Sequence, residues 1–453
     1  MSALFARHAL LPQGWCRDVA LRWDPQGTLT EVVVGAPEEG PAVGLAVPGM
    51  INLHSHAFQR AMAGLTERGG EGPDSFWTWR DLMYRFVARL TPDHLEAIAA
   101  MLFSECLRHG YTSVCEFHYV QRDPDGALYP RPAETAERVL AAAREAGIGL
   151  TLLPALYRFA GFGDAPLSPA QRRFQTDADL VLRLVEALEP ARDANVEVGV
   201  APHSLRAASV EQIRALLQGL PADRPVHLHI AEQVAEVEQC LAHTGRRPVE
   251  HLMHHLEIGP RWCLVHATHL NEAETVGIAR LGAVVGLCPT TEANLGDGLF
   301  PLEPFLAAGG RFGVGSDSHV SQSPVEELRW LEYGQRLAHR RRNVAVSAAQ
   351  RSVGQRLWEG ALDGGARASG RPVGALAVGR RADVVVLDDA HPNLEGLDPE
   401  DVLGTLLFNG NDPLVRDVMV GGVWVVRDRQ HLRQAEIAVR YRQTIAELRA
   451  LRA

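Results

Sequence analysis

Residues 47–56 read Val-Pro-Gly-Met-Ile-Asn-Leu-His-Ser-His, an apolar run that ends in two histidines one residue apart, His54 and His56. Side chains alternate between the two faces of a β-strand, so both imidazoles are expected on the same side. A metal ion can bind between such a pair. A single His-x-His motif is weak evidence in a chain with 19 histidines, so other strand ends must supply further ligands.

The same unit repeats along residues 48–319: a short apolar run rich in β-branched residues, a polar residue at its end, and a helix-periodic stretch closed by glycine. One helix is expected to open at Thr91-Pro92-Asp93 and to end at Gly110. Eight apolar runs follow the pattern, at residues 47–53, 112–117, 148–156, 196–202, 225–230, 263–267, 283–287 and 312–315. Strands that alternate with helices in this way predict an α/β fold, a (β/α)8 TIM barrel over residues 47–373, with its active site at the carboxyl ends of the strands.

Both ends of the chain have a different texture. Residues 1–46 and 374–430 carry short β-like runs separated by glycine turns, of which 384–387 and 418–426 are the clearest. We expect these two distant segments to pair into one small β-sandwich domain beside the barrel. Residues 431–453 predict an amphipathic C-terminal helix with a packing role.

Composition excludes several function classes. The net charge of −10 and the pI near 6.0 argue against general affinity for nucleic acid or an anionic membrane. No long apolar run predicts a membrane span, and the N-terminus lacks a basic stretch followed by an apolar signal core, so we expect a cytoplasmic protein. The six cysteines form no Cys-x-x-Cys pair, which predicts reduced thiols.

None of the 45 basic residues is a lysine; all are arginine. A Schiff base on lysine is therefore impossible in this chain. A carbamylated lysine that bridges two metal ions is impossible for the same reason.

Four residues at predicted strand ends can bind one divalent ion. His54, His56 and His229 supply nitrogen ligands and Asp317 supplies a carboxylate, a donor set for which zinc is the first expectation. Each histidine could instead be a core residue that bonds to the backbone. In His227-Leu228-His229 both imidazoles share a face; His229 lies nearer the strand end, and His227 is expected to have a structural or supporting role.

Glu232 and His266 are the candidate proton carriers. Glu232 lies three residues beyond His229, where a carboxylate could move a proton from water to a leaving nitrogen; the alternative is an idle loop carboxylate. His266 ends the sixth strand. It could be a fifth ligand, a general base, or a donor to a developing oxyanion, and the sequence does not rank these roles.

The strand-end motifs resemble those of the amidohydrolase superfamily, specifically its mononuclear deaminase branch. The motifs are Pro48-Gly49-Met50-Ile51-Asn52-Leu53-His54-Ser55-His56, His229-Ile230-Ala231-Glu232, Val265-His266, Cys288-Pro289 and Gly315-Ser316-Asp317. The resemblance covers essentially the whole chain. Binuclear members commonly have a bridging lysine at the end of strand four, where this chain has His203, so the resemblance implies one metal ion per chain.

Within that branch several stretches resemble the formimidoylglutamate deiminases of histidine degradation. The similar stretches are Gln59, Phe76-Trp77-Thr78-Trp79-Arg80, His118-Tyr119, Pro202-His203-Ser204-Leu205-Arg206, Glu232-Gln233 and Pro289-Thr290-Thr291-Glu292-Ala293-Asn294. The resemblance implies that Arg80 and Arg206 hold the substrate carboxylates. It also implies that Gln59, Tyr119 and His203 complete the pocket. Arginine suits this role because it forms bidentate pairs with carboxylates, although each could be a plain surface charge.

The implied reaction is hydrolysis of N-formimino-L-glutamate to N-formyl-L-glutamate and ammonia. Water activated by the metal attacks the formimino carbon, Asp317 or His266 accepts a proton, and Glu232 protonates the leaving nitrogen. His266 would also stabilise the tetrahedral intermediate. We expect a homodimer that acts on a small dianionic substrate.

Two other readings stay open. The first is a deaminase of the same branch that acts on a purine, pterin or adenosyl-type ring, for which paired arginines would be of little use. The second is a barrel that binds metal or ligand without turnover, for which Glu232 and His266 would have no task.

Overall fold

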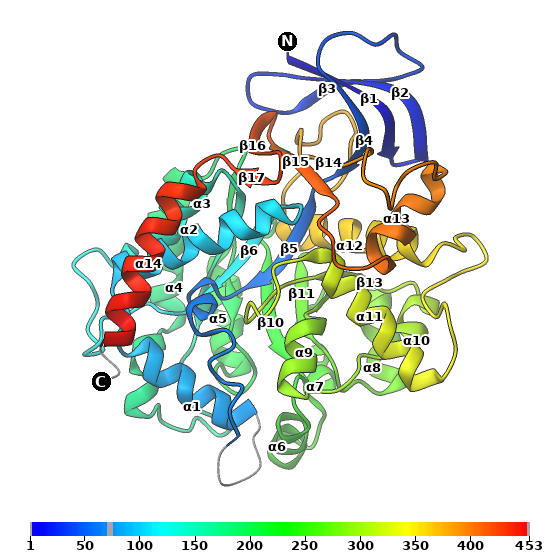
Figure 1. Cartoon of the computed structure of the whole chain (residues 1–453). Coiled ribbons are helices and arrows are strands. Elements are labelled where there is room, and N and C mark those ends of the chain that lie inside the picture. The colour runs from blue at the N-terminus through cyan, green and yellow to red at the C-terminus, as the bar shows by residue number, and fades with distance from the viewer. Residues whose placement is uncertain (1, 70–75, 451–453) are drawn as a thin grey trace.

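The computed structural model describes residues 2–69 and 76–450 (Figure 1). Its centre consists of two sheets in which all neighbouring strands are parallel. The strands are β5 (Met50–Ser55), β6 (Tyr111–His118), β7 (Gly149–Leu156), β8 (Val196–Val198) and β9 (Ala201–Pro202) in one sheet, and β10 (Val226–Ile230), β11 (Trp262–His266), β12 (Val284–Leu287) and β13 (Arg311–Val314) in the other. They occupy the eight predicted apolar runs, so the parallel α/β architecture is confirmed.

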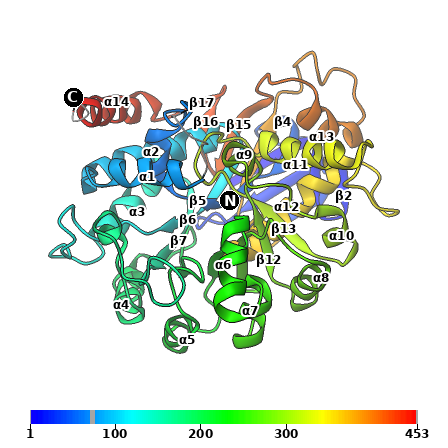
Figure 2. The ribbon, with the colours of Figure 1, turned by 90° about the horizontal axis from the view of Figure 1, so that it is seen from below.

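Helices lie outside these strands, as Figure 2 shows. They are η1 (Ala57–Met62), α1 (Phe76–Val87), α2 (Pro92–Arg108), α3 (Glu134–Ala146), η2 (Pro169–Phe174), α4 (Ala178–Leu188), η3 (Glu189–Ala191), α5 (Val210–Gly219), α6 (Val234–Thr244), α7 (Pro248–His255), α8 (Glu272–Leu281), α9 (Pro289–Leu295), α10 (Leu302–Ala307), α11 (Pro324–His339) and α12 (Val353–Ser369). The predicted start of α2 is confirmed, since the Thr91 side chain accepts a hydrogen bond from the His94 amide. Left-handed glycines end several helices; Gly147 ends α3 and Gly282 ends α8.

The two parallel sheets meet along two seams. At one seam Ser55 pairs with Asp317 in a parallel bridge, and the Asp317 amide donates to the His54 carbonyl at 3.0 Å. At the other seam Ser204 pairs with His229, whose amide donates to the His203 carbonyl at 3.1 Å. Because both seams lie at the carboxyl ends of the strands, they place residues that are distant in sequence beside each other.

The run 47–53, which we expected to be one strand, belongs to two strands. β4 (Ala42–Pro48) ends at Pro48 and β5 begins at Met50. Gly49 connects them where a Cβ would lie 2.1 Å from the Thr112 hydroxyl oxygen, so no larger residue fits there without displacement. The expectation was wrong because a continuous apolar run carries no sign that the chain changes sheets at Gly49.

The two ends of the chain pair with each other in one sheet. β1 (Ser2–Leu11), β2 (Gly14–Trp23), β3 (Leu29–Val34) and β4 join β14 (Val384–Leu387), β15 (Val415–Val420), β16 (Val423–Arg427) and β17 (Gln430–His431) in one continuous sheet of eight strands. β4 and β14 provide the link, with Val47 opposite Val385. Side chains from both ends of the chain, among them Leu4, Leu21 and Val384, form an apolar cluster of their own. Figure 1 shows this terminal sheet above the parallel strands and α1 below them.

Two further helices follow the parallel strands in sequence. α13 (Pro399–Phe408) packs against α11 and α12, and α14 (Gln434–Ala450) packs against α2. The predicted C-terminal helix is confirmed over Gln434–Ala450, where it buries Ile437 and Leu448; residues 451–453 lie outside the described part of the chain. None of the described helices is long and apolar enough to cross a membrane.

Candidate active site

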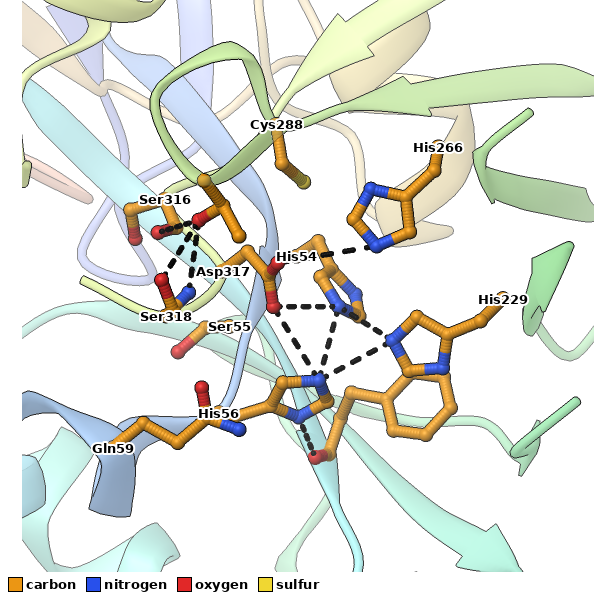
Figure 3. A network of polar contacts seen from close by, with 12 residues as sticks. His54, Ser55, His56, Gln59, His229, His266, Cys288, Ser316, Asp317 and Ser318 are labelled. Atoms are coloured by element: carbon orange, nitrogen blue, oxygen red, sulfur yellow. Dashed lines mark hydrogen bonds and ion pairs between the residues drawn. The ribbon is translucent and has the colours of Figure 1, made fainter. Parts of the chain in front are cut away.

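Three imidazoles converge at the carboxyl ends of the parallel strands (Figure 3). The Nε2 atoms of His54 and His56, at the end of β5, lie 3.2 Å apart. The Nε2 atom of His229, from β10, lies 3.0 Å from that of His54 and 3.3 Å from that of His56. The strand ends thus form a triangle of three nitrogen atoms.

Asp317 approaches this triangle from the other side of the seam, and together the four residues form what we call the histidine–aspartate cluster. Its Oδ1 atom lies 3.3 Å from His54 Nε2 and 3.5 Å from His56 Nε2. The Asp317 backbone has a φ of 44°, in the left-handed region that side chains other than glycine rarely adopt. Such strain is common at functional sites, and here it aims the carboxylate at the histidines.

The histidines are arranged as neutral metal ligands. His56 Nδ1 donates to the Phe117 carbonyl at 2.9 Å and His229 Nδ1 donates to the His203 carbonyl at 2.9 Å, which leaves each Nε2 lone pair directed into the cluster. Burial lowers the pKa of His54 and of His229 well below the usual value. Burial also lowers the pKa of His56.

The donor spacing fits a tetrahedral metal ion. Ligand bonds of about 2.1 Å give a tetrahedron whose edges are roughly 3.4 Å. The three Nε2 atoms lie 3.0 to 3.3 Å apart, and Asp317 Oδ1 lies 3.3 Å from His54 Nε2 and 3.5 Å from His56 Nε2. The Nε2 lone pairs of His56 and His229 and the Asp317 carboxylate converge on the same point, a donor set that suits a cation.

His266 is surrounded by carboxylates. Its Nε2 atom lies 3.7 Å from Glu232 Oε1 and 3.9 Å from Asp317 Oδ2, and its Nδ1 atom lies 3.3 Å from Glu292 Oε1. Burial alone would lower the pKa of His266, but the neighbouring carboxylates, Glu232 first, raise it to about 10. Burial raises the pKa of Glu232 to about 7. The pair can hold and exchange a proton near neutral pH.

A cavity of about 560 Å³, measured with its mouth, opens onto this cluster. Every predicted site residue except His54 lines it: His56, Gln59, Arg80, Tyr119, His203, Arg206, His229, Glu232, His266 and Asp317. His54 is fully buried behind the others. The structure therefore brings all the predicted site residues together.

Arg80 and Arg206 both line the cavity and both lie near Trp77. Their guanidinium carbons lie 4.5 Å and 5.8 Å, respectively, from the centre of a Trp77 ring. Arg206 is only 8% exposed. No ion pair joins either arginine to an acidic residue within residues 2–69 and 76–450. The cavity thus offers two positive charges to a ligand.

The remaining predicted pocket residues form a polar and aromatic wall. Gln59 Nε2 donates to the Tyr119 hydroxyl at 2.8 Å. The His203 ring packs against Tyr157 and Tyr119, with ring centres 4.7 Å and 5.5 Å away. Phe76 and Trp79, from the stretch 76–80 quoted above, line the cavity too. Tyr157, Met83, Phe174 and Leu295 also line it, and the sequence offered no signal for their position.

Two residues near the strand ends lie outside the cavity. Arg158 follows β7 but is exposed and does not line the cavity. His227 bonds to the Ala368 carbonyl of α12 at 2.8 Å, in agreement with its expected structural role. Two buried acids were missed as site neighbours: Glu292, which contacts His266, and Asp297, which groups with Glu232 and His266. Both lie in or just after α9; Glu292 belongs to the quoted stretch 289–294 but was given no role there, and no sequence pattern marks Asp297.

Comparisons with known proteins agree with this geometry. The model of the Amidohydrolase family matches residues 45–425. This parallel α/β fold, with three buried histidines and an aspartate clustered at its strand ends, is that of a known class of hydrolases. The chain belongs to the amidohydrolase family.

Three known proteins resemble this chain in sequence or structure. The formimidoylglutamate deiminase of Pseudomonas aeruginosa is 53% identical over 451 residues, which cover 99% of this chain and 100% of that protein. The crystal structure of an amidohydrolase from Brucella melitensis has a TM-score of 0.94 at 45% identity and covers 99% of this chain and 100% of its own. An adenosine deaminase from Xanthomonas campestris, solved with bound zinc, shares the fold, with a TM-score of 0.80 at 21% identity over 99% of this chain and 98% of its own.

Proposed function

We propose that the protein hydrolyses N-formimino-L-glutamate to N-formyl-L-glutamate and ammonia, a step of histidine degradation. The observation that carries the proposal is the pair Arg80 and Arg206, which face the same cavity as the histidine–aspartate cluster without an acidic partner in the described part of the chain. A substrate with two carboxylates and one hydrolysable amidine matches this layout. The 53% identity to a formimidoylglutamate deiminase over essentially both whole chains supports the same activity.

His54, His56, His229 and Asp317 would hold one divalent ion, and zinc fits their three nitrogens and one oxygen best. A zinc-containing structural neighbour supports this choice of metal. When bound, the ion would act as a Lewis acid and make a nearby water molecule more acidic. The absence of lysine supports a single ion, because no carbamylated lysine can bridge a second one.

The acid and base chemistry falls to Glu232 and His266. The attacking water forms a C–O bond with the formimino carbon and supplies the protons with which the nitrogen departs as ammonia. Glu232, with a pKa raised to about 7 by burial, accepts one of these protons and delivers it to that nitrogen. Cationic His266 stabilises negative charge on the attacking oxygen, and Asp317 Oδ2, which lies 3.9 Å from His266 Nε2, is the alternative first proton acceptor.

The rest of the cavity binds the glutamate portion. Arg206 and Arg80 form charge-assisted pairs with the two carboxylates. Gln59, Tyr119 and His203 line the same cavity and would orient the amidine. This division separates recognition, by the arginines, from bond cleavage, at the strand ends.

We propose a matching architecture. The two parallel sheets form one (β/α)8 barrel over residues 47–373, supported by the bridges at both seams. The described residues of the predicted segments 1–46 and 374–430 form a β-sandwich domain, supported by their separate apolar cluster, and α14 (Gln434–Ala450) is the C-terminal helix predicted within residues 431–453. The homodimer and the cytoplasmic location stay predictions.

An ammonia-release assay tests the function directly. The purified protein, loaded with zinc, is offered N-formimino-L-glutamate, N-formimino-L-aspartate and guanine. We expect efficient turnover of the first, weak turnover of the second because its carboxylates are one carbon closer together, and none of guanine. Preference for guanine would favour a ring deaminase, and no ammonia from any substrate under metal-loaded conditions would favour a binding protein.

A further inference from the structure

Arg173 is a buried arginine that lies outside the cavity. It belongs to η2 and is only 1% exposed, yet no described acidic residue forms an ion pair with it. Its Nη1 atom donates to the main-chain carbonyls of Val87 and, at 2.8 Å, of Leu90. Its Nε atom donates to the Arg122 carbonyl at 2.9 Å. A buried cation is thus satisfied almost entirely by backbone oxygens.

The positions of these carbonyls show which element Arg173 contacts. Val87 is the last residue of α1, and Leu90 follows it closely. The final carbonyls of a helix have no partner within the helix and carry the negative end of its dipole. A cation that bonds to them stabilises that end, so Arg173 caps α1.

α1 is the helix that covers the cavity. Phe76, Trp79, Arg80, Met83 and Tyr84 all line the cavity. Their spacing of three, four, seven and eight residues from the first places them on one face of the helix. Arg80 lies seven residues before Val87, roughly 10 Å along the axis, so a shift of the capped end moves the guanidinium.

The residues around Arg173 link the cap to the cavity wall. Phe174 packs against Tyr84 and Tyr119, with ring centres 5.8 Å and 4.9 Å away. The Arg173 carbonyl accepts hydrogen bonds from the Gln121 and Arg122 amides, each at 3.0 Å. α1 is therefore tied through Arg173 to the segment that directly follows Tyr119.

We propose that Arg173 is a positioning residue for substrate recognition, which caps the carboxyl end of α1 and so holds Arg80 in place to bind a substrate carboxylate. The substrate part of this inference rests on the proposed function. Because Arg173 acts through Arg80 and does not reach the histidine–aspartate cluster, its loss weakens binding of the dianion and leaves bond cleavage intact.

A double-mutant cycle tests the coupling. The parent protein, Arg173→Met, Arg80→Met and the double variant are compared for kcat and KM on N-formimino-L-glutamate, with zinc content measured for each. We expect Arg173→Met to raise KM about ten-fold and to change kcat by no more than about two-fold. In the Arg80→Met background the same substitution should have almost no further effect on kcat/KM, because the residue it positions is gone.

Two more variants separate positioning from general stability. Arg371→Met is the matched control, since Arg371 is also a buried arginine but contacts Ser113 and Ala194 near the amino ends of the strands; it should lower thermal stability and leave KM unchanged. Arg173→Lys keeps the charge but loses the fork of donors, so a smaller rise in KM is expected even if Arg173→Met folds poorly. Amide hydrogen exchange of α1 should become faster in both Arg173 variants.

The outcomes distinguish failure of the positioning role of Arg173 from failure of the proposed function. Equal losses of kcat/KM from Arg173→Met in the parent and Arg80→Met backgrounds would overturn the proposal, as would a fall in kcat at constant KM. Unchanged exchange in α1 in both Arg173 variants would overturn the cap itself. If the parent protein does not turn over N-formimino-L-glutamate while the α1 amides of the variants exchange faster, the cap stands and the proposed function fails.

Discussion

Arginines at the two ends of the parallel strands differ in the partners that the fold gives them. At the amino ends, Arg371 donates to Ser113 and to the Ala194 carbonyl, and Arg381 donates to the Gln26 carbonyl and to the Asn195 side chain. At the carboxyl ends, Arg80 and Arg206 contact aromatic rings but form neither a hydrogen bond nor an ion pair with any residue that the structure describes. Unpaired buried charge is costly, so a fold keeps it where a ligand supplies the partner. The amino ends are built for stability and the carboxyl ends for binding.

The largest effect is expected from removing a ligand of the histidine–aspartate cluster at the carboxyl ends of the strands. His56→Ala or Asp317→Ala should abolish binding of the metal ion and reduce turnover by roughly 10³-fold or more, because the remaining ligands no longer complete a tetrahedron. Metal analysis of the purified variants, with the ammonia assay, measures both effects. His227→Asn is the matched control on β10, and it should keep the metal because His227 bonds to Ala368 instead. Two equivalents of metal per parent chain, both needed for activity, would contradict the single-ion proposal.

The next largest effect is expected from a substitution that blocks proton transfer alone. Glu232→Gln keeps the shape of the side chain but cannot carry a proton, so kcat should fall by about 10²-fold or more while metal content stays normal. Glu238→Gln, an exposed substitution on the following helix, serves as the control and should leave kcat unchanged. Near-normal turnover in Glu232→Gln would show that this buried carboxylate has no catalytic task.

A smaller effect tests the comparison of the arginines directly. Arg206→Met should cost on the order of 2 to 5 kcal/mol in kcat/KM for N-formimino-L-glutamate, because one substrate carboxylate is left unpaired. Any weak activity on an uncharged formamidine should change far less. Arg214→Met, an exposed change on α5, is the control. Equal losses on both substrates would make Arg206 a structural residue, like Arg371, and would remove the difference between the two ends.

Much of the candidate active site could be predicted from the sequence, because parallel α/β folds carry their catalytic and ligand-binding residues at the carboxyl ends of the strands. His54, His56, His229 and Asp317 each follow an apolar run, and parallel strands bring their carboxyl ends together. Two features escaped for physical reasons. The first, the passage from β4 to β5 at Gly49, lies inside one apolar run, and a buried strand has no alternation that would mark it.

The second feature is the set of contacts that cross between loops. Glu292 meets His266, and Arg173 meets the end of α1, through segments far apart in sequence. The left-handed backbone at His266 and Asp317 has no sequence signal either, since these residue types adopt it only when the surrounding structure imposes it. Residue identity predicts the direct ligands well, while the residues that orient them need the folded chain.

The smallest expected effect extends the comparison to a buried histidine that already has a partner. His118 ends β6, contacts the Thr135 hydroxyl at 3.0 Å, and does not line the cavity. Burial lowers the pKa of His118 from 6.5 to about 3, so the folded protein keeps the ring neutral while the unfolded chain binds a proton below about pH 6.5. The contribution of His118 to stability is therefore complete above pH 6.5 and is lost as the pH falls toward 3.

Between about pH 8 and pH 5 this one group should reduce the free energy of unfolding by about 2 kcal/mol. In His118→Gln the difference in stability between the two pH values should shrink by that amount, as measured by urea unfolding of the metal-loaded protein. His339→Gln, at an exposed site on α11, should leave the difference unchanged. An equal pH dependence in the parent and His118→Gln would mean that protons enter the core at this position, and the neutral, partnered state assigned to His118 would be wrong.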